Sequence, residues 1–247
     1  ADRERQDSLQ KGGQPSPFIA ERPCGLSEHA GGTTFKELGI SRQSSPGIGT
    51  GLRMNQRTKL VVVLDACVIY PAPIRDFLLH LSTVDLFQPK WTSMIQEEWK
   101  RNLLIQRPDI RPEQLQRTIT EMNRAFPDAD VKHFEPLIDS LTLPDANDRH
   151  VLAAGICCRA NYISTFNLKD FPKSRLKPFD IEAISPDTLI MELIDQDQEK
   201  VLHAFQNQVR FLKNPPKTPQ QVVSALLKCG LKKTSTWIEM TIEESLD

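Results

Sequence analysis

Apolar residues along the chain alternate between short β-branched runs and stretches with helical spacing. Residues 60–64 read Leu-Val-Val-Val-Leu, which is too apolar for a strand with one wet face and indicates the central strand of a parallel sheet. Shorter strands are predicted near residues 86–89, 162–165 and 181–184. Helices are predicted between these strands, and such alternation is typical of an α/β fold with a central parallel sheet covered by helices on both faces.

The helical segments are predicted from apolar spacing and from residues that suit helix starts. Pro71 and Pro73 fit the first turn of a helix that reaches about Thr83, and Ser93 is expected to cap a helix that runs to about Gln106. Further helical patterns cover residues 112–125, 131–141 and 147–159.

The composition divides the chain into three parts. Nine of the eleven glycines precede Met54, and this stretch lacks the periodic apolar residues that would offset its ordering entropy. Residues 1–53 are therefore expected to be a disordered leader or an artificial extension, with Met54 as the natural start. Residues 54–185 form the predicted α/β domain. The pattern then becomes wholly helical, with a proline-rich break at 214–219, which predicts a small all-helical appendage over residues 186–247.

Charge and cysteine content exclude some classes of protein. The formal net charge of -1 gives no overall attraction to nucleic acid, so any RNA binding must come from local basic patches. The five cysteines form no CxxC pair and no zinc-ligand array. The chain contains no apolar run of the roughly 20 residues that a membrane span needs and no signal-peptide pattern. A cytoplasmic location without membrane contact is expected.

Acidic residues follow or flank several of the predicted elements. Asp65 ends the most apolar strand, where parallel sheets bind ligands, although an Asp there can simply bond to the backbone of the next turn. Glu98 lies beside the apolar face of the 93–106 helix, where most glutamates are solvated. Asp145 and Asp148 lie at the start of the 147–159 helix, where acids commonly act as caps. Asp170 belongs to the loop after the strand at 162–165.

These acids could converge on one site, and their mutual repulsion would then require a cation. Oxygen ligands without His or Cys partners suit Mg²⁺ or Mn²⁺. Such an ion lowers the pKa of a bound water and neutralises charge on a phosphoryl oxygen. The pattern therefore favours hydrolysis of phosphodiesters.

Four stretches of the chain resemble the four motifs of PIN domains, most closely those of VapC-type ribonuclease toxins from toxin–antitoxin pairs. The stretches are residues 63–70, the helix that carries Glu98, residues 148–154 and residues 163–171. The resemblance implies that Asp65, Glu98, Asp148 and Asp170 are the catalytic, metal-binding acids. Thr165, Asn167 and Asp145 would support them, and Asn167 departs from relatives that carry an acid there.

The resemblance also implies a Mg²⁺- or Mn²⁺-dependent endoribonuclease, a small cognate antitoxin as protein partner, and a homodimer. RNA phosphates would meet basic side chains near the site. The candidates are Arg75, Lys100, Arg101, Lys169, Lys173, Arg175 and Lys177.

Other interpretations stay open. The chain could be a catalytically inactive PIN-like module that binds RNA or protein, or another Mg²⁺-dependent phosphohydrolase. A dehalogenase-type phosphatase would need an acid where Cys67 stands, and an NTPase would need a Walker A loop, which residues 47–51 do not form. The histidines match no metal-ligand spacing, so His80, His133 and His150 are interpreted as packing or surface residues.

Overall fold

Four parallel strands form the sheet at the centre of the molecule. The computed structural model describes residues 59–244, and the predictions made for residues 1–53, 47–51 and Met54 lie outside these residues. The strand order is β2-β1-β3-β4. The strands are β1 (Leu60–Leu64), β2 (Phe87–Lys90), β3 (Tyr162–Ser164) and β4 (Glu182–Ile184). The predicted α/β class and parallel sheet are confirmed.

The interior strand β1 is paired on both sides. Val63 lies opposite Lys90 of β2 and Ile163 of β3, and Val62, Val63 and Leu64 are buried. The chain leaves β1 for a neighbour on one side and later adds β3 on the other side. In open α/β sheets, ligands bind at the carboxyl ends of the strands where the strand order changes direction, which in this sheet is at the ends of β1 and β3.

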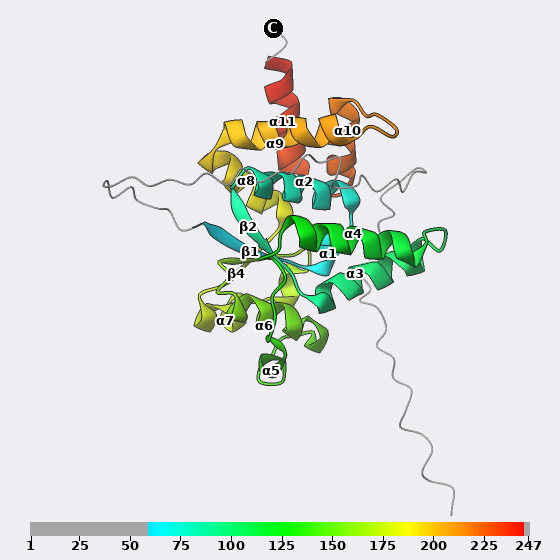
Figure 1. Ribbon diagram of the computed structural model, residues 1–247. Helices are drawn as coiled ribbons and strands as arrows, with labels where there is room; N and C mark the ends of the chain where they lie inside the picture. Colours follow the sequence, from blue (N-terminus) through cyan, green and yellow to red (C-terminus); the bar gives the residue numbers. More distant parts are fainter. Residues whose placement is uncertain (1–58, 245–247) are drawn as a thin grey trace, which may run out of the picture.

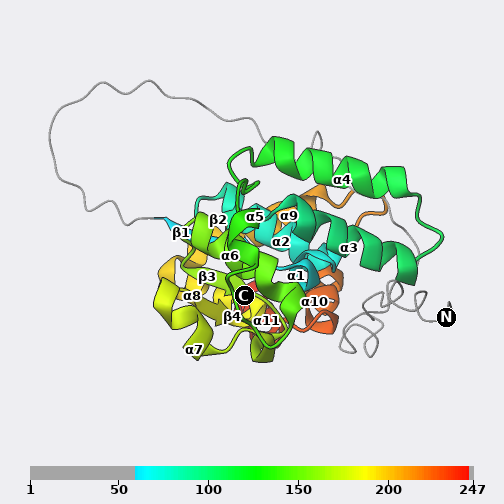
Figure 2. The ribbon, with the colours of Figure 1, turned by 90° about the horizontal axis from the view of Figure 1, so that it is seen from below.

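Helices cover both faces of the sheet (Figure 1). On one side lies α2 (Ala72–Thr83), and on the other lies α6 (Arg149–Cys157), which packs on β1 and β3. The short α1 (Ala66–Ile69) follows β1 and contacts α3 (Ser93–Gln106). Figure 2 shows α3 beside α4 (Pro112–Ala125) at one side of the molecule.

Short helical turns complete the α/β region near its loops. They are α5 (Glu135–Ile138), η2 (Ala146–Asp148), η3 (Leu168–Asp170), α7 (Lys173–Leu176) and η4 (Lys177–Phe179).

The predicted helical appendage consists of α8 (Pro186–Gln196), α9 (Gln198–Phe211), α10 (Pro219–Lys228) and α11 (Lys232–Glu244). It packs over α2 rather than standing apart (Figure 1). The Phe205 ring meets Phe77 edge to face with 6.1 Å between centroids, and the Gln208 side-chain amide donates to the Pro73 carbonyl at 2.9 Å. One continuous apolar core therefore runs from β1 to α11.

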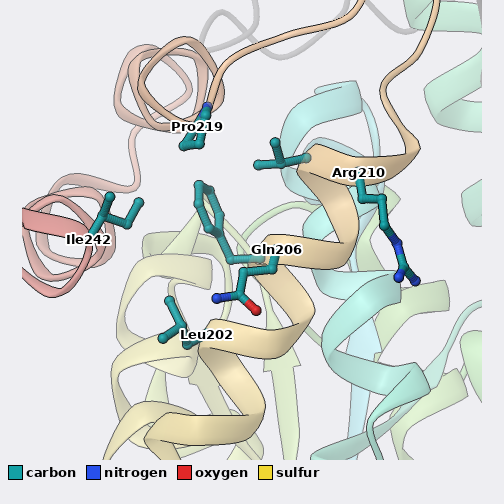
Figure 3. Close-up of a pocket in the computed structure, with 7 residues that line it drawn as sticks. Leu202, Gln206, Arg210, Pro219 and Ile242 are labelled. Atoms are coloured by element: carbon teal, nitrogen blue, oxygen red, sulfur yellow. The ribbon is translucent and has the colours of Figure 1, made fainter. Parts of the chain in front are cut away.

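A cavity of about 290 Å³ lies within this helical part. Figure 3 shows Leu202 and Gln206 of α9, Pro219 of α10 and Ile242 of α11 around it. Its lining is mostly apolar, and none of the acids singled out in the sequence contributes to it.

Two local predictions were wrong. Thr92, not Ser93, caps α3, because the Thr92 hydroxyl accepts the Ile95 amide at 3.1 Å. The helix expected over 131–141 shrinks to α5, since the preceding backbone pairs with Trp91 instead. The Trp91 amide donates to the Ala129 carbonyl, and the Trp91 carbonyl accepts from the Val131 amide.

His80 of α2 gives the fold a testable dependence on pH. Its ring is buried and stacks on Phe211 with 5.8 Å between centroids. Burial, helped by the positive charge of Arg210, lowers the pKa of His80 from 6.5 to about 4. The unfolded chain therefore binds the proton more tightly, and stability must fall as the pH drops from about 6.5 toward 4.

We expect wild-type protein to lose about 2 kcal/mol more unfolding free energy than His80→Phe between pH 7.5 and pH 5. The phenyl ring retains the stacking but does not titrate. Urea unfolding at several pH values measures the difference. Parallel pH profiles for the two proteins would show that His80 does not contribute as described.

Candidate active site

Asp65 lies at the carboxyl end of β1 and is 4% exposed. It caps α1, because its Oδ1 accepts the Ala66 amide at 2.6 Å. Its Oδ2 accepts the Thr165 hydroxyl at 2.7 Å and the Cys67 thiol at 3.1 Å. Burial raises the pKa of Asp65, and the negative charge of Glu98 raises it further. Asp65 therefore caps α1, as the alternative interpretation predicted, and its carboxylate is also affected by the negative charge of Glu98.

Thr165 joins the carboxyl end of β3 to that of β1. Its side chain is fully buried. The hydroxyl donates to Asp65 and accepts the backbone amide of Asn167 at 3.0 Å. Asn167 thus contacts the cluster through its backbone. The Cys67 sulfur accepts the Phe166 amide at 3.3 Å, so the loop after β3 is tied to the residues after β1.

Asp145 and Asp148, at the start of α6, differ in their hydrogen bonds. The Asp145 carboxylate accepts the Asn147 amide at 2.9 Å and caps η2. Asp148 is the N-cap residue of α6, yet its side chain makes no capping hydrogen bond. The capping alternative therefore describes Asp145, whereas the Asp148 carboxylate makes no capping hydrogen bond.

The predicted acids lie near one another around Asp148. Burial is the largest of the effects that together raise the pKa of Asp148 to about 8, and the negative charges of Asp65, Asp145, Asp170 and Glu98 follow in that order. Four separate segments therefore bring their carboxylates close enough to affect one another's charge. Within residues 59–244, however, no three His, Cys, Asp or Glu side chains are grouped closely enough to hold a metal ion as they stand.

Glu98 lies on α3 and is paired with a histidine that sequence reasoning interpreted as packing or surface. The His150 Nε2 is 3.3 Å from the Glu98 Oε2, and the side chains are 7% and 29% exposed respectively. The buried ring does pack as expected, but its contact with Glu98 was missed. The one available signal was the position of His150 two residues after Asp148, at the start of the same helix.

The basic candidates for RNA contact fall into two groups. The Arg75 guanidinium covers the Trp99 ring at 5.3 Å, and its side chain is only 11% exposed. Lys100 is paired with Glu97 at 2.6 Å. The exposed members of the set are Arg101, Lys169, Lys173, Arg175 and Lys177.

The helical appendage reaches the loop after β3. Gly230, between α10 and α11, has a φ of +103°, and a Cβ there would lie 3.5 Å from the Phe166 ring. Phe166 is itself 39% exposed. The turn between the last two helices thus contacts the loop that carries Thr165.

A four-stranded parallel sheet covered by helices, with acids near its carboxyl edge, is consistent with a PIN-like fold. Residues 186–238 match the family described as "VapC50 C-terminal domain". The chain is 40% identical over 79 residues to a Mycobacterium tuberculosis protein named "Putative ribonuclease VapC50". These matches confirm the predicted resemblance to VapC-type proteins.

The extent of these matches is partial. The alignment with the mycobacterial protein covers 32% of this chain and 47% of that protein, so it spans about half of the relative's length. No solved structure matches the chain. In the part of the chain that the structure describes, no helix is long and apolar enough to cross a membrane.

The crowding of acids predicts a stability effect at Asp148. Because its pKa is raised in the folded protein to about 8, folding favours the protonated acid, and this contribution is lost as the pH rises from about 4 toward 8. In a chelator, Asp148→Asn should therefore be more stable than wild type at pH 8. Discounted for solvent screening, we expect a gain of about 2 kcal/mol.

Thermal unfolding at pH 5 and pH 8 measures this effect. The advantage of Asp148→Asn should be small at pH 5 and largest at pH 8, and the exposed Asp195→Asn variant is the control. An Asn variant that is equally stable or less stable than wild type at pH 8 would contradict the described repulsion.

Proposed function

We propose that this protein is a metal-dependent endoribonuclease, the toxin of a toxin–antitoxin pair. The observation that carries the proposal is the clustering of acids at the carboxyl end of β1. Asp65 is buried there and accepts the hydroxyl of Thr165, the residue directly after β3, at 2.7 Å. The charges of Asp65, Asp170 and Glu98 also repel that of Asp148. A divalent cation would compensate this repulsion. The VapC-type matches of the chain support the same activity.

The donor set fits Mg²⁺ or Mn²⁺. Carboxylate oxygens are the ligands that these ions prefer, and Asp65 and Asp148 would hold the ion together with Glu98 and Asp170. In the described part of the chain, no three of these side chains are close enough together to bind one ion. Binding would therefore require side-chain rotations toward the ion. When bound, the ion would lower the pKa of a water and neutralise charge on the scissile phosphate.

The chain's own hydrogen bonds would orient Asp65 for this task. A carboxylate has about four lone-pair directions. At Asp65, Oδ2 receives both Thr165 and Cys67, whereas Oδ1 receives the Ala66 amide. Among the residues that the structure describes, one lone pair of Oδ1 therefore has no hydrogen-bond donor, and we propose that it binds the cation. Thr165 thus holds the acid in place and leaves it an oxygen for the metal.

The substrate that we propose is RNA, with phosphate contacts from the exposed Arg101, Lys169 and Lys173. The whole protein has a formal net charge of -1 and does not attract RNA in general. The positive charge of these side chains would attract RNA phosphates locally. A small antitoxin would cover this edge of the sheet, and a homodimer in the cytoplasm completes the proposal.

Cleavage of a total RNA pool tests the function directly. We expect wild-type protein to cut RNA with Mg²⁺ or Mn²⁺ and to stop in EDTA. Asp65→Asn should reduce the rate at least about a hundredfold, because it removes a negative ligand and leaves the volume unchanged. Asp195→Asn on α8 is the matched control and should cut like wild type.

Thermal unfolding checks that both variants are folded. The proposal fails if wild-type protein cuts no RNA with either metal. It also fails if Asp65→Asn cuts as fast as the control.

A further inference from the structure

We propose that His150 is a positioning residue that holds the Glu98 carboxylate in place for the metal ion. The inference rests on the proposed function, because it assigns His150 to the same site. It follows from a contact between two elements that are distant in sequence, α3 and the first turn of α6. His150 lies too far inside the fold to be a surface residue, with 6% of its area exposed.

The contact itself is a polar pair between an imidazole nitrogen and a carboxylate oxygen. Nε2 of His150 and Oε2 of Glu98 are 3.3 Å apart, slightly more than the usual separation of about 2.7–3.2 Å between an N–H donor and an oxygen. Glu98 is the more exposed partner, at 29% against 7%. The buried ring is therefore the fixed member of the pair, and the glutamate is the member that it restrains.

The other ring nitrogen indicates which tautomer is present. Among residues 59–244, the buried Nδ1 of His150 finds no hydrogen-bond partner. A hydrogen on Nδ1 would leave a buried donor unsatisfied, which is unfavourable. The neutral tautomer with its hydrogen on Nε2 avoids this and places a donor nitrogen 3.3 Å from the Glu98 carboxylate. The ring is thus arranged to orient a carboxylate.

This arrangement links two of the acids through one helix start. Asp148 precedes α6 and His150 is its second residue, so the same turn supplies one acid and restrains another. Without the ring, a partly exposed glutamate would sample several rotamers, and binding an ion would have to order it. Residues that orient metal ligands typically change metal affinity by about 10- to 100-fold.

Two substitutions separate the donor from the volume of the ring. Gln places its amide nitrogen near the position of Nε2, whereas Asn reaches only to about Nδ1. His150→Gln should therefore keep a donor next to the Glu98 carboxylate, and His150→Asn should lose it. His150→Met fills the space without a donor and replaces the Asn variant if that protein does not fold. His203→Asn, at an exposed position of α9, is the matched control.

Calorimetric titration with Mn²⁺ measures affinity without reference to RNA cleavage. We expect His150→Gln and the His203 control to bind within about threefold of wild type, and His150→Asn to bind at least about tenfold more weakly. In a Glu98→Gln background, where the ligand is already neutral, His150→Asn should cause no further loss.

The outcomes distinguish this inference from the proposed function. Equal Mn²⁺ affinity in wild type, His150→Gln and His150→Asn would overturn the role of His150 and leave the nuclease standing. A Gln variant as weak as the Asn variant would also overturn it, because the ring would then act by packing alone. Wild-type protein that binds no Mn²⁺ would remove the metal site itself, and this inference with it.

Discussion

Electrostatic repulsion among partly buried carboxylates is the constraint on which the structure of the site depends. Asp148 lies close enough to Asp65, Asp145, Asp170 and Glu98 for all four charges to raise its pKa. Such an arrangement opposes folding unless protons or a cation compensate it. The rest of the molecule has to hold these side chains near one another. A divalent cation, as in the proposed function, would compensate their repulsion.

The parallel sheet and its helices provide that support. β1 is buried and paired on both sides, so Asp65 follows a rigid strand. Thr165 connects the end of β3 to Asp65, and the turn at Gly230 contacts the Phe166 ring in the same loop. The helical appendage, which shares the core with α2, therefore braces both the sheet and one loop of the site.

The sequence was sufficient for features that depend on local patterns. The apolar run of β1, the prolines at the start of α2 and the start of α8 at Pro186 all predicted elements that the structure contains. It was insufficient where distant segments compete. Residues 129–131 pair with Trp91 instead of starting a helix, and the contact of His150 with Glu98 has no signature in either stretch alone. The sequence also could not show which of Asp145 and Asp148 caps a helix, since either acid could do so.

The central claim is that Asp65 at the end of β1 and Asp148 at the start of α6 bind the same divalent ion. A crystal structure of the wild-type protein grown with Mn²⁺, with anomalous data, tests it most directly. The account predicts an anomalous peak about 2.0–2.3 Å from carboxylate oxygens of both Asp65 and Asp148. A structure with these two side chains ordered and no manganese between them would contradict the account.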